Sequence, residues 1–272
     1  MPSLSDKRAA FRQLHTAGSF VMPNPWDVGS ARYLQGVGFK ALATTSAGLA
    51  WSKGLADGEV TREVVLAHVA EISAKADVPL NVDFESGFAD DAAGVAESVR
   101  LCVEAGASGL SIEDYSGDRA EPLYPMDQAV ARIAAARAAI DATGADVLLT
   151  GRCEAFLRGR PKLDEVIARL QAYAAAGADC LYAPAITTRA QIEAVVEAVA
   201  PKPVNVLIGF ASELTVLQLA DLGVRRISVG GALAKTAWGG FMAAAREIAE
   251  AGRFDSFANL PPTGDITGAM GR

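Results

Sequence analysis

The chain has 272 residues, a formal net charge of -7 and a sequence pI near 5.0. This acidic balance argues against a nucleic-acid-binding protein or one that docks on anionic membranes, because both need a basic patch to displace counterions. Hydrophobic residues at 51% and charged residues at 21% are typical of a globular protein with a sizeable core.

The first residues, MPSLSDKRAAFRQLH, contain no apolar signal core, and no run reaches the roughly 20 apolar residues of a membrane span. The three cysteines, Cys102, Cys153 and Cys180, are odd in number and widely spaced, which is typical of reduced thiols rather than of disulfides or a zinc site. We therefore expect a cytoplasmic protein without a membrane segment, in which Cys102 and Cys180 are small core residues.

Short β-branched or apolar runs alternate along the chain with longer Ala-rich segments of helical period. The predicted strands are SFVMPN (19–24), FKALATTS (39–46), PLNVDFE (79–85), SGLSIED (108–114), DVLLTGR (146–152), DCLYAP (179–184), PVNVLIG (203–209) and RISVGG (226–231). Helices are predicted at 61–76, 90–106, 126–144 and 163–177, and the last three of these segments end at Gly, a common helix stop.

The junction between helix and strand repeats, as AGASGLSIED, AGADCLYAP and DLGVRRISV. This recurring unit predicts an α/β fold, a (β/α)8 barrel of the TIM type, in one domain over residues 1–272. A doubly wound open sheet is the alternative, but the GxGxxG motif that usually follows its first strand is absent from this sequence. We expect a C-terminal helix and tail from about residue 241, with ANLPPTGDITGAMGR (258–272) as the tail.

Acidic residues stand at the ends of the third and fourth predicted strands, where an eightfold barrel has its active site. Asp83 and Glu85 in NVDFESGF are two apart and therefore face the same side, and Glu113 lies in the corresponding place one strand on. Such close carboxylates repel one another unless a cation lies between them, so the pattern favours a Mg2+ site, with Mn2+ as the other candidate ion. The alternative is that Asp83 and Glu85 cap the next helix or pair with Arg152.

Arg152 ends the fifth strand, where its planar guanidinium suits a carboxylate or an oxyanion; the alternative is a salt bridge to Glu154 or Glu113. Ser46 precedes a loop of small residues whose backbone N–H groups could hold an oxyanion, and the alternative is a turn-forming serine. The two histidines, His15 and His68, lie inside predicted helices, so we expect no histidine base.

The segments PNPWDVGSAR, ATTSAGLAWSKGLADGE, NVDFESGF, LSIEDY and LTGRCEAF, in this order and spacing, resemble the isocitrate lyase / phosphoenolpyruvate mutase superfamily over roughly residues 18–240. The resemblance implies a TIM-type barrel that binds Mg2+ and an α-oxo or α-hydroxy acid, and that makes or breaks a C–C or P–C bond through an enolate-like intermediate. It also implies a homo-oligomer, dimer or tetramer, in which the segment after Gly240 is exchanged between subunits.

The resemblance assigns roles residue by residue. It implies Asp83 as the direct metal ligand, with Glu85, in place of the more usual Asp, and Glu113 acting through metal-bound water. The implied catalytic residues are Asp57, Glu113 and Arg152, and the implied substrate-binding residues are Ser46, Ala47, Asp83, Arg152 and Asn205.

The chain departs from the superfamily in two places. The loop after the fourth strand, DYSGDRAEPLYP, lacks the Cys of isocitrate-type lyases and the Lys and Asn of the mutase, and GRCEAF stands where many relatives have RTDA. Loss of CO2 from an oxo acid needs no dedicated acid, so we expect an oxaloacetate decarboxylase-like C–C lyase for a small α-oxo or dicarboxylic acid. The alternatives are a P–C bond enzyme such as a phosphonopyruvate hydrolase, or a non-catalytic dicarboxylate-binding member.

The same loop, from Tyr115 to Pro125, is longer than the usual two to six residues of such connections. We expect it to be a mobile lid over the metal site, and the alternative is an ordinary surface excursion.

Overall fold

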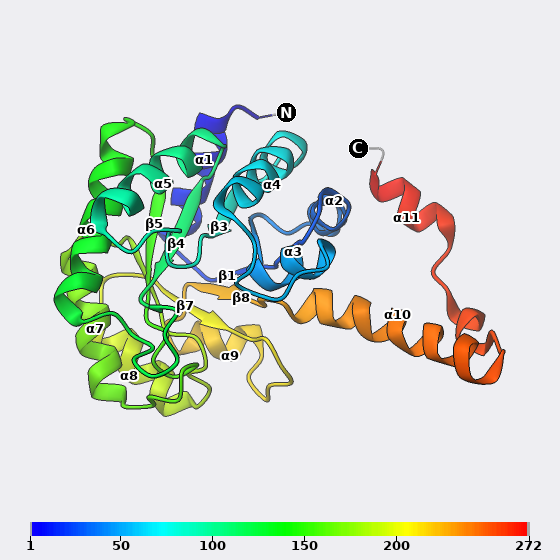
Figure 1. Cartoon of the computed structure of the whole chain (residues 1–272). Helices are drawn as coiled ribbons and strands as arrows, with labels where there is room; N and C mark the ends of the chain where they lie inside the picture. Colours follow the sequence, from blue (N-terminus) through cyan, green and yellow to red (C-terminus); the bar gives the residue numbers. More distant parts are fainter. Residues whose placement is uncertain (1, 271–272) are drawn as a thin grey trace.

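Eight parallel strands form one sheet in the order β1-β8-β7-β6-β5-β4-β3-β2 in the computed structural model, which describes residues 2–270 (Figure 1). The strands are β1 (Phe20–Met22), β2 (Leu42–Ala43), β3 (Leu80–Asp83), β4 (Gly109–Glu113), β5 (Leu148–Arg152), β6 (Cys180–Tyr182), β7 (Val204–Leu207) and β8 (Arg226–Ser228). The Ala43 N–H donates to the Pro23 carbonyl at 3.0 Å and so links the two ends of the sheet. The predicted (β/α)8 barrel and its eight strands are confirmed.

Helices alternate with the strands and surround the barrel (Figure 1). They are α1 (Leu4–Leu14), α2 (Val28–Val37), α3 (Ser46–Ser52), α4 (Arg62–Lys75), α5 (Ala92–Glu104), α6 (Met126–Ala142), α7 (Leu163–Ala175), α8 (Arg189–Val199) and α9 (Val216–Asp221). The glycines predicted to stop α5, α6 and α7 have left-handed φ angles of 108°, 69° and 106°, which glycine adopts without steric strain. No helix within residues 2–270 is long and apolar enough to cross a bilayer.

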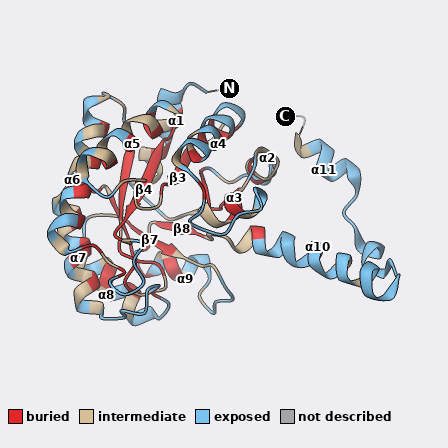
Figure 2. Cartoon of the chain, in the orientation of Figure 1, coloured by how far each residue is buried: buried red, intermediate tan, exposed pale blue. Residues whose placement is uncertain are grey.

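The apolar core lies between the sheet and the helices, and Figure 2 shows the strands buried inside the helical layer. Val82, Leu110, Leu149 and Ile227, for example, are each at most 2% exposed and belong to this layer. Because side chains alternate along a strand, the intervening residues face the barrel interior, where many of them are polar. The buried cysteines Cys102 and Cys180 are core residues, as predicted.

The C-terminal region differs from the expected boundaries. The helix α10 (Ala232–Ala251) begins directly after β8 rather than at about residue 241, and it extends away from the barrel (Figure 1). The segment read as a tail contains the end of η1 (Asp255–Asn259) and α11 (Thr263–Met270), and residues 271–272 lie outside the described part. The helix α11 contacts α2, where the Arg32 guanidinium donates to the Met270 carbonyl. Exchange of α10 between subunits stays a prediction.

Candidate active site

Two adjoining cavities open at the carboxyl ends of the strands. The outer one has a volume of about 510 Å3 and the inner one about 340 Å3, and Ser46, Asp57, Arg152 and Leu157 line both. The predicted residues Glu85 and Glu113 line the outer cavity, and Ala47, Asp83 and Asn205 line the inner one. The structure therefore brings all eight predicted site residues to one mouth of the barrel.

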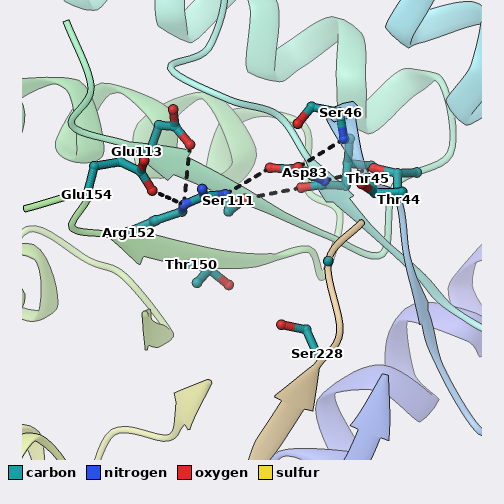
Figure 3. A network of polar contacts seen from close by, with 12 residues as sticks. Thr44, Thr45, Ser46, Asp83, Ser111, Glu113, Thr150, Arg152, Glu154 and Ser228 are labelled. Carbon is teal, nitrogen blue, oxygen red and sulfur yellow. Dashed lines mark hydrogen bonds and ion pairs between the residues drawn. The ribbon is translucent and has the colours of Figure 1, made fainter. Parts of the chain in front are cut away.

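Arg152 is the centre of the polar network at this mouth (Figure 3). Its Nη1 lies 3.1 Å from Asp83 Oδ1, and its Nε lies 3.3 Å from Glu113 Oε2 and 2.7 Å from Glu154 Oε1. Burial lowers the pKa of Arg152, but the carboxylates of Glu113, Glu154 and Asp83 outweigh it and hold that pKa well above its ordinary value. The pairing that we considered as an alternative for Asp83 and for Arg152 is thus present in this structure.

Asp83 is fixed from two sides. Its Oδ2 accepts from the Ser46 N–H at 3.1 Å, and its own N–H donates to Thr44 Oγ1 at 2.9 Å. Ser46 is the first residue of α3 because Thr45 caps that helix, its hydroxyl accepting from the Gly48 N–H at 3.3 Å. The Ser46 N–H is engaged by Asp83 here, and the residues after it, whose N–H groups were considered above as oxyanion donors, form the helix α3.

Glu85 is held in an unfavourable environment for a charged carboxylate. Its φ of 47° lies in the left-handed region, and its Oε1 is buried without a hydrogen-bond partner within residues 2–270. Burial, followed by the charges of Asp83 and Asp57, raises the pKa of Glu85 to about 7. Burial likewise raises the pKa of Glu113 well above its ordinary value, so the charged form of both glutamates is disfavoured.

These oxygen donors suit a hard divalent cation. Asp83, Glu85 and Glu113 surround the same mouth, and the buried Glu85 oxygen has a lone pair to offer to an ion or to its bound water. No group of three His, Cys, Asp or Glu side chains within residues 2–270 converges closely enough to hold an ion directly. Direct binding of an ion by Asp83, with Glu85 and Glu113 acting through water, stays a prediction.

Glu154 lines neither cavity and holds Arg152 through an ion pair. It is fully buried, its Oε2 lies 3.1 Å from Arg158 Nη2, and its N–H donates to Asp114 Oδ1 at 2.7 Å. Asp114 Oδ2 in turn accepts from the Tyr173 hydroxyl at 2.6 Å. The unusual GRCEAF segment thus ties Arg152 to a buried network, a role that the sequence alone did not reveal.

Cys153 is buried and does not line either cavity. Burial and the nearby Asp114 raise the pKa of its thiol well above the ordinary value. His15 and His68 also lie outside the cavities, and burial lowers their pKa values to about 3 and about 4. That no histidine base serves the site stays a prediction.

The loop from Tyr115 to Pro125 forms part of the outer cavity through Tyr115, Arg119 and Pro122. It is folded back on itself by an antiparallel bridge between Tyr115 and Leu123 and by the Ser116 N–H, which donates to the Pro122 carbonyl at 2.9 Å. The Arg158 guanidinium lies 3.5 Å from the centre of the Tyr115 ring. The loop therefore lies where a lid would, and its mobility stays a prediction.

Sequence reasoning missed several lining residues. Arg158 and Tyr115 belong to the outer cavity, and Tyr182, Arg226 and Ser228 belong to the inner one. Tyr182 ends β6 and Ser228 ends β8, so the position of both at a strand end was a usable signal.

Comparisons with known proteins agree with this architecture. The family described as phosphoenolpyruvate phosphomutase matches residues 11–249. A solved structure from Burkholderia cenocepacia J2315, of a protein with a proposed lyase or mutase activity, has a TM-score of 0.94 and 49% identity over 97% of this chain and 96% of its own. The oxaloacetate decarboxylase of Bradyrhizobium sp. (strain ORS 278) is 30% identical over 80% of this chain and 74% of its own. The 2-methylisocitrate lyase of Escherichia coli (strain K12) is 36% identical over 61% of this chain and 57% of its own.

Proposed function

The chain belongs to the phosphoenolpyruvate phosphomutase family, in the superfamily that includes isocitrate lyase, and we propose that it is a metal-dependent lyase that decarboxylates oxaloacetate or a similar small α-oxo acid. The observation that carries this proposal is the lining of the two cavities. It combines Arg152, which is held by three carboxylates, with several acidic and hydroxyl groups, but in residues 2–270 it contains neither Cys nor His.

Arg152 binds and orients the substrate in this proposal. A carboxylate of the bound acid takes the place of Asp83 or Glu113 at the guanidinium fork, which is preorganised because Glu154 holds Nε at 2.7 Å. As CO2 leaves, negative charge develops on the remaining enolate, and Arg152 lies beside it. A preorganised donor of this kind contributes about 2.7–4 kcal/mol to stabilisation of the transition state.

Mg2+ or Mn2+ would be held directly by Asp83, with Glu85 and Glu113 acting through water. When bound, the ion polarises the substrate carbonyl and carboxylate and neutralises the charge of the enolate. Release of Asp83 from Arg152 on substrate binding would free this carboxylate for the ion.

The proton that completes the reaction comes from solvent. A lyase of the isocitrate type needs an acid to protonate its departing carbanion, and the Tyr115–Pro125 loop supplies no Cys, Lys or His for this role. Decarboxylation releases a neutral molecule and leaves a pyruvate enolate that water can protonate, so the existing residues suffice. Asp57, whose pKa is raised by burial, lies close enough to Ser46 for a hydrogen bond and can orient it toward the substrate.

Steady-state assays with Mg2+ test the proposal. Oxaloacetate, phosphonopyruvate, isocitrate and 2-methylisocitrate are compared, with a blank that contains metal alone because Mg2+ itself promotes loss of CO2 from oxaloacetate. We expect pyruvate from oxaloacetate at a rate that chelation of the metal abolishes. Faster release of phosphate from phosphonopyruvate would indicate a P–C bond enzyme, and no turnover of any substrate would indicate a binding protein.

We further propose that the chain is cytoplasmic and forms a dimer or tetramer through α10. Apolar side chains on this helix support the assembly, since Trp238, Phe241 and Met242 are 40%, 62% and 42% exposed in the single chain.

A further inference from the structure

A row of polar residues runs around the inside of the barrel. Glu113, Arg152, Tyr182, Asn205 and Arg226 are successive partners in register from β4 to β8. Residues that pair in register on neighbouring strands face the same side of the sheet. The row therefore begins at the mouth with Glu113 and ends with Arg226, which is 2% exposed inside the barrel.

Arg226 makes only neutral contacts. Its Nε donates to Asn205 Oδ1 at 2.9 Å, its Nη2 to Thr150 Oγ1 at 2.9 Å and its Nη1 to Asn81 Oδ1 at 3.4 Å. In residues 2–270, no carboxylate lies within 4.0 Å of its nitrogens, whereas Arg152 on β5 has three carboxylate partners. A buried guanidinium without a counter-ion costs several kcal/mol, so the fold holds a positive charge that a bound anion would stabilise.

The inner cavity reaches this charge. Arg226, Asn81, Ser111 and Ser228 all line it, and Figure 3 shows Ser228 and Thr150 below the level of Asp83 and Arg152. Asn81 is two residues before Asp83 on the same strand, which places the lower level about 6–7 Å beneath the upper one at about 3.3 Å per residue. A small ligand can therefore contact Arg226 without displacing the ion pair of Arg152.

The lower level presents hydrogen-bond donors rather than acceptors. The amide oxygens of Asn81 and Asn205 both accept from Arg226, and Asn205 Nδ2 donates to Ser228 Oγ at 3.0 Å. The Asn81 amide group donates to no other group within residues 2–270 and is available to a ligand, whereas the Ser111 hydroxyl donates to the Val82 carbonyl at 3.4 Å and Ser228 lies within hydrogen-bond reach of Tyr182. The one histidine close to Arg226, His15, has its pKa lowered to about 3 by burial and by the charge of Arg226, so it adds no positive charge near neutral pH.

We propose that Arg226, Asn81, Ser111 and Ser228, named here the Arg226 pocket, bind one small monovalent anion, either a halide or a carboxylate group. The acidic residues of the inner cavity do not oppose this, because Asp83 is paired with Arg152 at the upper level and Asp57 lies with Ser46 at the boundary with the outer cavity. This anion site does not depend on the proposed decarboxylation. The anion is either a free inorganic ion or the end carboxylate of an acid bound in the inner cavity.

Bromide is the probe. Crystals of the full chain are soaked in sodium bromide and its position is found by anomalous scattering, while bromide NMR line broadening measures affinity in solution. The test variant is Asn205→Asp, nearly isosteric, which places a carboxylate 2.9 Å from Arg226 Nε as a built-in counter-ion. The control is Arg225→Met, which removes a half-buried positive charge at the neighbouring position, where Arg225 donates to the Gly18 carbonyl.

We expect a bromide within hydrogen-bond distance of Arg226 in the natural protein and in Arg225→Met, and at least tenfold weaker binding in Asn205→Asp. Displacement of bromide by oxalate would identify the site as one for a substrate carboxylate, and simultaneous binding would identify a free inorganic ion. Water alone beside Arg226 at saturating bromide, or equal bromide affinity in Asn205→Asp, would overturn the proposal. The bromide map of the natural protein decides the question even if the variant does not fold.

Discussion

Replacing Arg152 with Lys separates the charge of this residue from its geometry. The guanidinium nitrogens lie 3.1 Å from Asp83, 3.3 Å from Glu113 and 2.7 Å from Glu154, and the planar group fixes the directions of these contacts. A lysine keeps the positive charge but presents a single nitrogen at the end of a flexible chain, so it cannot serve the substrate and Glu154 together with the same geometry.

The expected magnitude follows from these contacts. A hydrogen bond to a charged group contributes about 1.5–3 kcal/mol, and we expect two such contacts to weaken when the fork is lost. A combined loss of about 3–4 kcal/mol in the transition state lowers kcat/KM by a factor of about 100 to 1000, at about 1.36 kcal/mol per tenfold change. The fold should persist, because the buried carboxylates retain a cation.

The assay is steady-state release of pyruvate from oxaloacetate with Mg2+, together with a thermal unfolding curve for each protein. Arg137→Lys is the matched control, since Arg137 is also half-buried and pairs with Asp179 at 3.1 Å but does not line either cavity. Arg137→Lys should keep the natural kcat/KM. If Arg152→Lys also keeps it, Arg152 is only structural and the proposed mechanism is wrong.

Three further substitutions and one comparison of substrates test the other assignments. Asp83→Ala should abolish most activity and weaken Mg2+ or Mn2+ binding in calorimetry, and an unchanged binding isotherm would remove Asp83 from the metal site. Glu85 has a folded pKa raised from 4.5 to about 7, so its contribution to the stability of the metal-free protein is fully present below pH 4.5 and is lost as pH rises through about 7. Glu85→Gln should flatten that part of the pH dependence in denaturant titrations, and an unaltered slope would contradict the raised pKa. Cleavage of isocitrate and 2-methylisocitrate should be negligible beside decarboxylation of oxaloacetate. Robust release of glyoxylate or pyruvate from either substrate would show that the chain is a lyase of the isocitrate type. Phe241→Asp, on the exposed face of α10, should lower the mass measured by light scattering, whereas an unchanged mass would exclude this face from the assembly.

The barrel could be predicted from sequence because its signals are local and repeated. Each strand is a short apolar run, and the glycines at 106, 144 and 177 stop their helices through backbone conformations that other residues disfavour. The start of α10 was placed too late, although Gly230 and Gly231 separate it from β8 and Gly231 is its N-cap. Only its first turn packs on the core, through Leu233 and Ala234, and periodicity alone does not locate the boundary of a helix whose later apolar residues are mostly exposed.

The site residues that could be predicted from sequence are those at the carboxyl ends of predicted strands. Asp83, Glu113 and Arg152 were found in this way, and the structure brings them within ion-pairing distance. The salt bridge of Glu154 to Arg152 was considered as an alternative, but its contacts with Arg158 and Asp114 could not be predicted, because they depend on how the chain turns after β5. Arg226 escaped notice since it lies two residues before the end of its strand, where side chains usually fill the core.

The separation of apolar packing from polar groups in this barrel has a consequence for evolution. The larger apolar cluster lies outside the sheet, where Val82, Leu110 and Ile227 meet the helices, while most of the polar residues that line the inner cavity lie inside. A substitution on the inner face therefore changes which acid fits without removing much of the buried apolar area that stabilises the fold. Descendants of such a chain can acquire new substrates with little loss of thermodynamic stability, which would let one scaffold diversify among decarboxylation, lyase and phosphonate chemistry.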